Sequence, residues 1–236
     1  MYTFNKCSFP GCNKTALSSF NEQGEIIDKP GYCFEHTEMP EQMLSNMRNY
    51  ILSHEKIVGL NANGITIDNI DLTNKKLYGC NLQNCTMRSI HANGLRARMC
   101  MMDFCTFSDC DLLNSNIQFS SFSGSRLVHI LFTGSDLIHN NFNGITAYQS
   151  SFDDSDLYNS RFIKAMLINT SLNNCNLKKT VFYECIREGV GFKLSNTRES
   201  LVDRNRGGLM GDINTNLEDD DIETLNTDEY SEGKSL

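Results

Sequence analysis

A period of five residues dominates the arrangement of apolar and polar positions. Apolar side chains recur at every fifth position from Ile67 to Phe182, in 24 consecutive steps without one polar residue. This period differs from the 3.6 residues of an α-helix turn and from the simple alternation of a strand. A fixed period of this kind indicates a repeat architecture, in which stacked units share one continuous interior.

Small residues fall two positions before many of these apolar residues. Residues two apart in extended backbone point to the same side, so we expect both to line the interior. The residue between them is usually polar and should point outward, as at Asp111, Asp136 and Asp156. The last two residues of each unit turn a corner, where glycines such as Gly124 and Gly134 relieve backbone strain.

The units at 135–139, Ser-Asp-Leu-Ile-His, and at 155–159, Ser-Asp-Leu-Tyr-Asn, show the pattern most clearly. They resemble the pentapeptide-repeat family, whose motif is roughly small–Asp/Asn–Leu/Phe–x–x. The resemblance covers about residues 62–192 and implies an all-β fold, a right-handed quadrilateral β-helix with four units per coil. The 24 units then make about six coils. Residues twenty apart should stack, so that one interior column contains Phe122, Phe142, Phe162 and Phe182.

Several positions depart from the pattern. Lys75 and Asn140 fall where small interior residues are expected, and we expect Lys75 to bend outward near the end of the rod. Alanine at the large position predicts a locally narrower interior in the early coils; it occurs at Ala92, Ala97 and Ala147. The pattern meets Arg187, where we expect the regular solenoid to stop, with Phe192 as one further inward residue.

Seven of the ten cysteines occupy the small interior position: Cys80, Cys85, Cys100, Cys105, Cys110, Cys175 and Cys185. Reduced cysteine behaves there as a small buried hydrophobe, and this interpretation is the favoured one. A redox or metal cluster is the alternative, because Cys80 would stack on Cys100 and Cys85 on Cys105. We expect free thiols in a reducing compartment.

The other three cysteines and one histidine form a separate set, Cys7, Cys12, Cys33 and His36, spaced Cys-x4-Cys-x20-Cys-x2-His. Thiolates and imidazole in fours are the usual ligands of structural zinc. The segment is similar to small Cys3His zinc knuckles, and we expect residues 1–38 to bind Zn²⁺ there. The alternative is a disulfide with one free cysteine, or four unrelated residues.

Further segments follow from composition. Residues 39–59 have helical apolar spacing and predict a helix that caps the rod, which we place at residues 60–192. Residues 193–236 predict a linker and a disordered acidic tail. Residues 200–236 contain 3 Lys+Arg against 10 Asp+Glu, whereas residues 60–199 contain 13 against 12.

Composition also narrows the function. Residues 1–59 contain 5 Lys+Arg against 7 Asp+Glu, and since no segment is dominated by basic residues, nucleic-acid binding is not favoured. No apolar run is long enough to span a membrane. The first residues lack a secretory signal, which predicts a cytoplasmic protein, with signal-less export left open. No phosphate loop, nucleophile elbow or carboxylate pair suggests an enzyme.

Binding is therefore the expected activity. One side of the rod should present aromatic and other apolar residues together with arginines. Aromatic residues and arginine are favoured at interface centres. The side consists of Tyr78, Arg96, Arg98, Met99, Phe119, Ile138 and Tyr158. We expect this side to dock a protein partner or a second copy; alternatively, the corner residues fold back over the rod. The family resemblance implies a second function, a DNA mimic that binds a topoisomerase, but that requires a strongly acidic rod.

Overall fold

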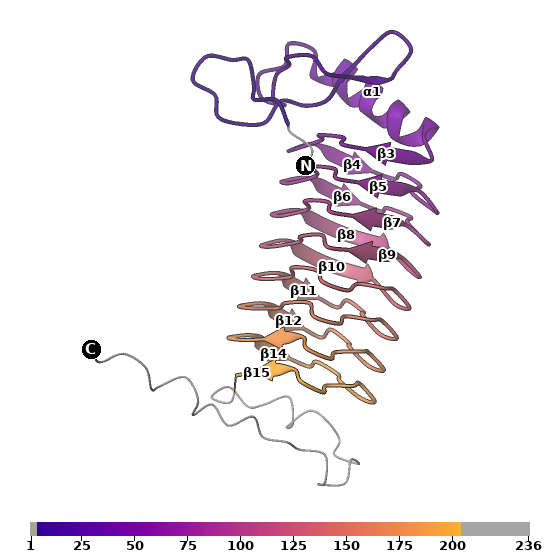
Figure 1. The fold of residues 1–236 in the computed structure, drawn as a ribbon, viewed down its shortest axis with the longest axis vertical. Helices are drawn as coiled ribbons and strands as arrows, with labels where there is room; N and C mark the ends of the chain where they lie inside the picture. Colours follow the sequence, from indigo (N-terminus) through magenta and orange to yellow (C-terminus); the bar gives the residue numbers. More distant parts are fainter. Residues whose placement is uncertain (1–3, 204–236) are drawn as a thin grey trace, which may run out of the picture.

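The computed structural model describes residues 4–203, which form a rod of stacked coils with a small cap at its N-terminal end (Figure 1). Parallel strands pair residues that are twenty apart, so that Leu127 lies beside Phe107 in one direction and beside Ala147 in the other. Because four five-residue units make twenty residues, each unit forms one side of a four-sided coil. The predicted quadrilateral β-helix is confirmed.

Two parallel ladders run along opposite sides of the rod. The longer sheet has seven strands: β4 (Thr66–Asp68), β6 (Thr86–Arg88), β8 (Thr106–Asp111), β10 (Arg126–Leu131), β11 (Thr146–Tyr148), β12 (Met166–Ile168) and β14 (Ile186–Glu188). The shorter sheet has four strands: β3 (Lys56–Val58), β5 (Lys76–Tyr78), β7 (Arg96–Arg98) and β9 (Asn116–Gln118). A two-stranded ladder, β13 (Val181–Phe182) with β15 (Leu201–Val202), lies near the C-terminal end.

The solenoid is longer at both ends than the boundaries 60–192 that the sequence suggests. At the start, β3 already pairs with β5, and Ile57 is fully buried in the same inward position as the later residues. At the end, the ladder passes through Arg187, which pairs with Leu167, because backbone hydrogen bonds do not depend on the inward side chain. Beyond residue 192, β15 still pairs with β13. The expected acidic tail lies outside the described residues.

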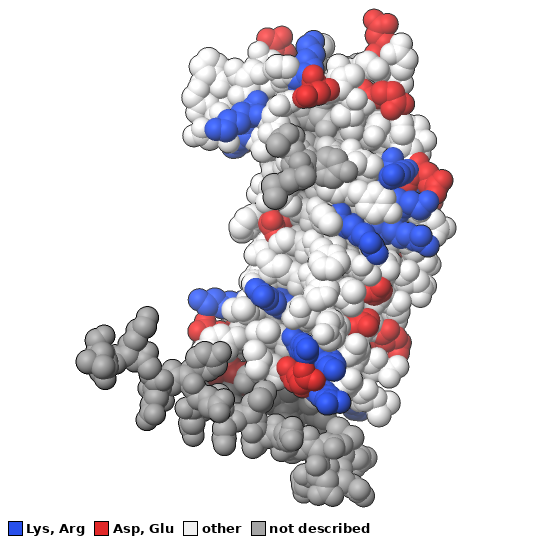
Figure 2. Space-filling model, viewed as in Figure 1, with Lys and Arg blue, Asp and Glu red and all other residues white. Residues whose placement is uncertain are grey.

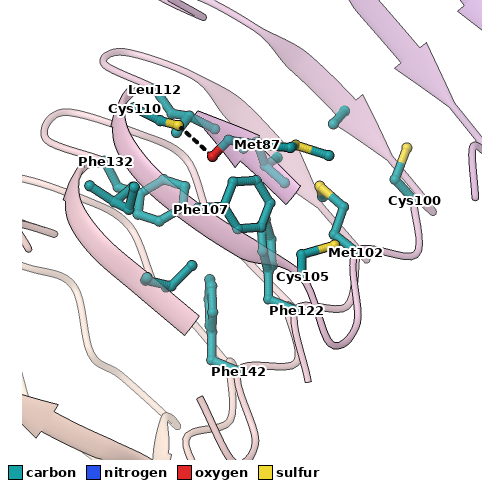
Figure 3. Packing of buried hydrophobic residues seen from close by; sticks show 14 of the residues in the cluster. Met87, Cys100, Met102, Cys105, Phe107, Cys110, Leu112, Phe122, Phe132 and Phe142 are labelled. Carbon is teal, nitrogen blue, oxygen red and sulfur yellow. Dashed lines mark hydrogen bonds between the residues drawn. The ribbon is translucent and has the colours of Figure 1, made fainter. Parts of the chain in front are cut away.

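Stacked aromatic rings fill the C-terminal half of the interior. Phe142 lies between Phe122 and Phe162, with ring centroids 5.1 and 4.9 Å away and nearly parallel planes. Phe152 meets this column edge-on from the opposite side of the coil, at 5.7 Å from Phe142. Figure 3 shows Phe122 and Phe142 one below the other. The predicted phenylalanine column is therefore confirmed.

Small polar residues in the interior connect neighbouring coils by hydrogen bonds. The Ser135 hydroxyl accepts a bond from the Ser115 backbone N–H at 2.9 Å and donates to the Leu112 carbonyl at 3.0 Å. Cysteine thiols occupy the same place, as where Cys110 lies beside the carbonyl of Met87 (Figure 3). The seven interior cysteines are all buried, as predicted.

The alanines of the early coils are offset by neighbouring large residues, which the expectation of a narrower interior did not include. Where alanine takes the large position, a large residue takes the small one, as in Ile90 with Ala92 and Leu95 with Ala97; all four are buried. This exchange keeps the twenty-residue register, and Ala97 pairs with Ile117. The compensation is incomplete, because an apolar cavity of about 40 Å³ remains beside these residues.

The corners adopt left-handed backbone, and many of them are not glycine: Met99 and Phe119 both have a φ of 53°. Left-handed backbone alone therefore does not require glycine, but one corner requires it for lack of space. A Cβ atom on Gly124 would lie 2.7 Å from the ring of Phe104, which covers that glycine from the coil before. The glycine therefore makes room for an aromatic side chain.

The cap consists of helix α1 (Pro40–Ser53) and a hairpin, β1 (Ser19–Phe20) with β2 (Ile26–Ile27). Met47 and Ile51 of α1 are buried and belong to the same hydrophobic core as the first coil of the rod. Lys75 bends outward as expected, and its ammonium group donates to the carbonyls of Leu52 and His54 at the end of α1. The helix is shorter than the expected 39–59, because residues 56–58 already belong to the solenoid. No helix within residues 4–203 combines the length and the apolar character that a membrane span requires.

Candidate metal centre and docking face

Four potential metal ligands converge in the cap. One ligand atom from each of Cys7, Cys12, Cys33 and His36 lies within 4.8 Å of the others. The Nδ1 atom of His36 is 3.3 Å from Cys33 Sγ and 3.5 Å from Cys7 Sγ, and Cys12 Sγ is 4.0 Å from Cys33 Sγ. Tetrahedral zinc with ordinary bond lengths would separate sulfur from nitrogen by about 3.5 Å and two sulfurs by about 3.8 Å. These three separations are thus close to those of a tetrahedral coordination shell.

Two short turns bring the ligands together. In the first, the Cys12 N–H donates to the Phe9 carbonyl at 3.1 Å, and Gly11 has a φ of 79°. In the second, the His36 N–H donates to the Cys33 carbonyl at 3.0 Å. A bond of 2.9 Å from the Ser8 N–H to the Gly31 carbonyl holds the two turns side by side. Each turn therefore contributes two ligands, as the spacing predicts.

The surroundings of the thiols affect their ionisation in opposite ways. Burial opposes ionisation of Cys7, but hydrogen bonds from the Cys33 and Phe9 backbones and from His36 lower its pKa to about 6. Burial raises the pKa of Cys33. The ring of Phe9 stacks on His36 with 3.9 Å between centroids, which fixes the imidazole plane. Since metal ligands must be thiolates, the low pKa of Cys7 favours metal binding.

The cap is joined to the rod at Asn61, a residue that the sequence analysis did not single out. Asn61 is 2% exposed, and its backbone N–H donates to the Ser18 hydroxyl at 2.8 Å. The Ser18 N–H donates back to the Asn61 carbonyl at 2.9 Å. Leu17 beside it packs into the core of the rod. The first coil therefore has its open edge covered by the segment between Cys12 and Cys33.

The residues expected to dock a partner all lie on the side of β5, β7 and β9. We call this set the docking face: Tyr78, Arg96, Arg98, Met99, Phe119, Ile138 and Tyr158. Met99 and Phe119 project from corners and are 69% and 53% exposed. Tyr78 and Tyr158 are half-buried, and lysine ammonium groups lie 5.7 and 5.8 Å from their respective ring centroids.

A continuous aromatic column runs along this face. Phe119 stacks on His139 one coil further on, with centroids 4.9 Å apart and planes 12° from parallel. The His139 ring then meets Tyr158 edge-on at 5.7 Å. The place of His139 between two aromatic residues is a finding of the structure. The corner residues stack along the rod, and Met99 and Phe119 stay open to solvent.

Residues 141–178 match the family model described as pentapeptide repeats, with 8 copies. Residues 141–178 are therefore pentapeptide repeats, and the resemblance that the sequence indicates is confirmed. The inward leucines and phenylalanines, the small residues before them and the twenty-residue coil all follow from this repeat. No curated protein sequence matches the chain.

Solved pentapeptide-repeat structures are similar to this chain at low identity. HetL, involved in heterocyst differentiation regulation in the cyanobacterium Nostoc sp. strain PCC 7120, is 12% identical, with 62% of this chain and 86% of HetL covered and a TM-score of 0.24. Full-length QnrB1, a plasmid-mediated fluoroquinolone resistance protein, is 14% identical, with 64% and 94% covered and a TM-score of 0.25. Rfr23 from the cyanobacterium Cyanothece 51142 is 15% identical, with 67% and 99% covered and a TM-score of 0.21. These matches assign no function to this chain.

Sequence reasoning missed a second outward apolar group, on the opposite side of the rod. Tyr148 and Ile186 are 39% and 48% exposed there, and Val128 and Ile168 pair with Tyr148 from the neighbouring coils. The signal was present in the sequence, because these residues stand directly before or after an inward position.

Proposed function

We propose that this protein is a non-enzymatic interaction scaffold that binds a protein partner through the docking face. The observation that supports the proposal is the exposure of Met99 and Phe119, 69% and 53%, at corners of the same ridge. Large apolar side chains gain nothing for the rod when they point into water, and exposed aromatic and apolar groups beside arginine are typical of interface centres. Arg96 and Arg98 supply the polar contacts beside them.

The rigid interior suits a scaffold. Side chains fill the coils, and the phenylalanine columns hold the C-terminal half of the rod together. The outward residues are consequently held at fixed spacings, and little conformational freedom is lost when a partner binds. Because these residues recur at fixed spacings along the rod, we expect the rod to recognise an extended surface of the partner.

Partner capture tests this function. The full chain is immobilised and compared with a variant that carries Met99→Ser and Phe119→Ser. Tyr183→Ser serves as the control, because Tyr183 is 51% exposed on another side of the rod. A specific protein that is identified with the unaltered chain and with the control, but not with the double variant, supports the proposal. Equal capture by all three chains would overturn it.

We further propose that Cys7, Cys12, Cys33 and His36 bind one Zn²⁺ with a structural role. The support is the match between the ligand distances and tetrahedral zinc, together with the low pKa of Cys7. Four protein ligands leave no open position for a substrate, so the metal would hold the two turns together. It would thereby stabilise the segment that covers the first coil, since so short a segment buries little apolar surface.

DNA mimicry is the less favoured function. Acidic side chains on the rod frequently pair with basic ones of the neighbouring coil, as in Asp68 with Arg88 and Asp109 with His129. A mimic of duplex DNA requires a regular array of unpaired negative charge. The alternation of both signs supports docking to a mixed protein surface instead.

A further inference from the structure

Charge changes sign along one column of the docking face. Lys76, Arg96 and Asn116 lie on successive coils because β5, β7 and β9 pair in register. Isolated bridges continue the column from Asn116 to Asp136 and from Asp136 to Asp156. The column therefore has a basic half before Asn116 and an acidic half after it. Figure 2 shows Lys and Arg side chains gathered near β5 and β7, and Asp and Glu side chains further down that side.

The chain itself leaves most of these charges without an opposite partner. Asp136 accepts bonds from the side-chain amides of Asn116 and Gln118, at 2.9 and 2.6 Å. Asp156 accepts from the Asn176 amide at 3.0 Å. Within residues 4–203, neither carboxylate and neither arginine of the face takes part in a salt bridge, although Lys76 meets the exposed Glu55. Neutral amides orient the carboxylates without neutralising them.

We propose that the docking face binds a second copy of this chain, with the two rods antiparallel. The proposal rests on the proposed function, since it uses the same face and names its partner. A twofold axis that lies in the interface, along the strand direction at the level of Asn116, reverses the order of the coils. It places Arg96 opposite Asp136 of the second copy and Lys76 opposite Asp156 of the second copy. Symmetry makes each of these pairs twice.

The neighbouring positions fit the same symmetry. Phe119 lies on the level of the axis and faces Phe119 of the second copy. Tyr78 faces Tyr158, and Arg98 faces Ile138. Aromatic and apolar groups therefore meet in the columns beside the charged column, and aromatic residues and arginine are enriched in protein interfaces. Parallel rods would instead bring Arg96 level with Arg96 and Asp136 level with Asp136, and like charges would repel.

A zero-length carbodiimide crosslink on the purified full chain tests this arrangement directly. Lys76 and Asp156 are four coils apart in one chain, about 19 Å at the ordinary strand spacing of ~4.8 Å. An amide bond between them therefore reports two chains. We expect this crosslink by mass spectrometry in the dimer band, and its loss at about 1 M salt, where screening is strong. Lys76 with Glu55, 2.6 Å apart within one chain, is the internal control for reactivity.

Charge exchange tests the pairing in solution. Arg96→Asp alone and Asp136→Arg alone should each weaken association at least about tenfold in sedimentation equilibrium, because each opposes like charges across the axis. The double variant restores opposite charges and should associate again. The pair Lys76→Asp and Asp156→Lys repeats the test without touching the amides that hold Asp136, and thermal unfolding confirms that each variant is folded.

The outcomes separate this proposal from the proposed function. A chain that is monomeric at its highest soluble concentration would overturn the antiparallel pairing. A dimer whose association is unchanged in the charge-exchange variants would overturn it as well. If the monomer still captures a partner that depends on Met99 and Phe119, the scaffold function stands without self-association. If capture is independent of those residues as well, both proposals fail.

Discussion

The side-chain amide of Asn140 donates a hydrogen bond of 2.7 Å to the carbonyl oxygen of Ile117 in the preceding coil. The same group donates to the Leu137 carbonyl at 2.9 Å, and its oxygen accepts from the Ser120 N–H at 2.8 Å. Asn140 is 2% exposed. A buried polar group is tolerated when it is hydrogen-bonded, and this explains why an asparagine stands where serine or cysteine is usual.

Removal of these bonds should destabilise the rod. We expect Asn140→Ala to lower the free energy of unfolding by about 1–3 kcal/mol, because it leaves the Ser120 N–H and the Ile117 carbonyl without their partner. Asn140→Ser is the matched control, since Ser160 makes the corresponding two contacts one coil further on, at 3.0 and 2.8 Å. Urea denaturation measures both variants. Equal losses would show that the bonds contribute little.

The phenylalanine column should be the most sensitive part of the interior. Phe142 contacts stacked rings on both sides, and Phe142→Ala should lower the free energy of unfolding by about 3–5 kcal/mol. Phe119→Ala removes the same atoms from an exposed corner and should cost far less. Thermal and denaturant unfolding distinguish the two, and a small effect at Phe142 would contradict tight packing.

Filling the cavity should stabilise the early coils. Ala97 lines the cavity of about 40 Å³, and Ala97→Val should raise the free energy of unfolding by up to about 1 kcal/mol, the cost of a void of that size. Ala147→Val is the control, because Ala147 is fully buried away from that cavity and overpacking there should destabilise by about 1–3 kcal/mol. Changes of opposite sign in the free energy of unfolding of these two variants would confirm the cavity, and changes of the same sign would contradict it.

Metal content tests the cap. Protein purified without added zinc should contain one Zn²⁺ per chain, and Cys33→Ser should lose it, because three ligands hold the metal less firmly than four. Cys175→Ser changes a buried interior cysteine and should keep the metal. Chelation should make the segment before α1 sensitive to protease while the rod stays folded. Equal metal content in both variants would exclude this ligand set.

His129 gives the rod a small pH dependence. Its hydrogen bonds to Asp109 and Gln149, both 2.9 Å, raise the pKa of His129. A raised folded pKa stabilises the protein below the unfolded value of about 6.5, and the effect is lost as pH rises through the folded pKa. His129→Gln should therefore destabilise slightly at low pH and hardly at high pH.

An NMR titration of His129 measures this pKa directly. Asp109→Asn should lower it towards the ordinary value, because the amide carries no charge to favour the imidazolium. The effect on stability stays small since both groups are exposed to solvent. A His129 pKa that does not respond to Asp109→Asn would assign the shift to another cause.

Part of the metal centre could be predicted because its ligands are rare residue types in close pairs. Cys7 with Cys12 and Cys33 with His36 each belong to one turn, so local chain geometry already brings two ligands together. The attachment of the cap through Asn61 and Ser18 could not be predicted, because their hydrogen bonds join residues 43 apart. Neither residue differs by type from the many exposed asparagines and serines of this chain.

The inward and outward positions could be read from the sequence, because a five-residue period repeats locally and tolerates few exceptions. The sequence also indicated the phenylalanines that line the interior and the residues of the docking face. A period of five does not state how many units close a coil, and the resemblance to known repeats supplied that number. Three features are visible only in the tertiary structure. They are the way in which Ile90 and Leu95 offset the alanines, the place of the remaining cavity, and the charges that face solvent without a partner. These features depend on contacts between coils, where side chains distant in sequence compete for one volume and one set of hydrogen bonds.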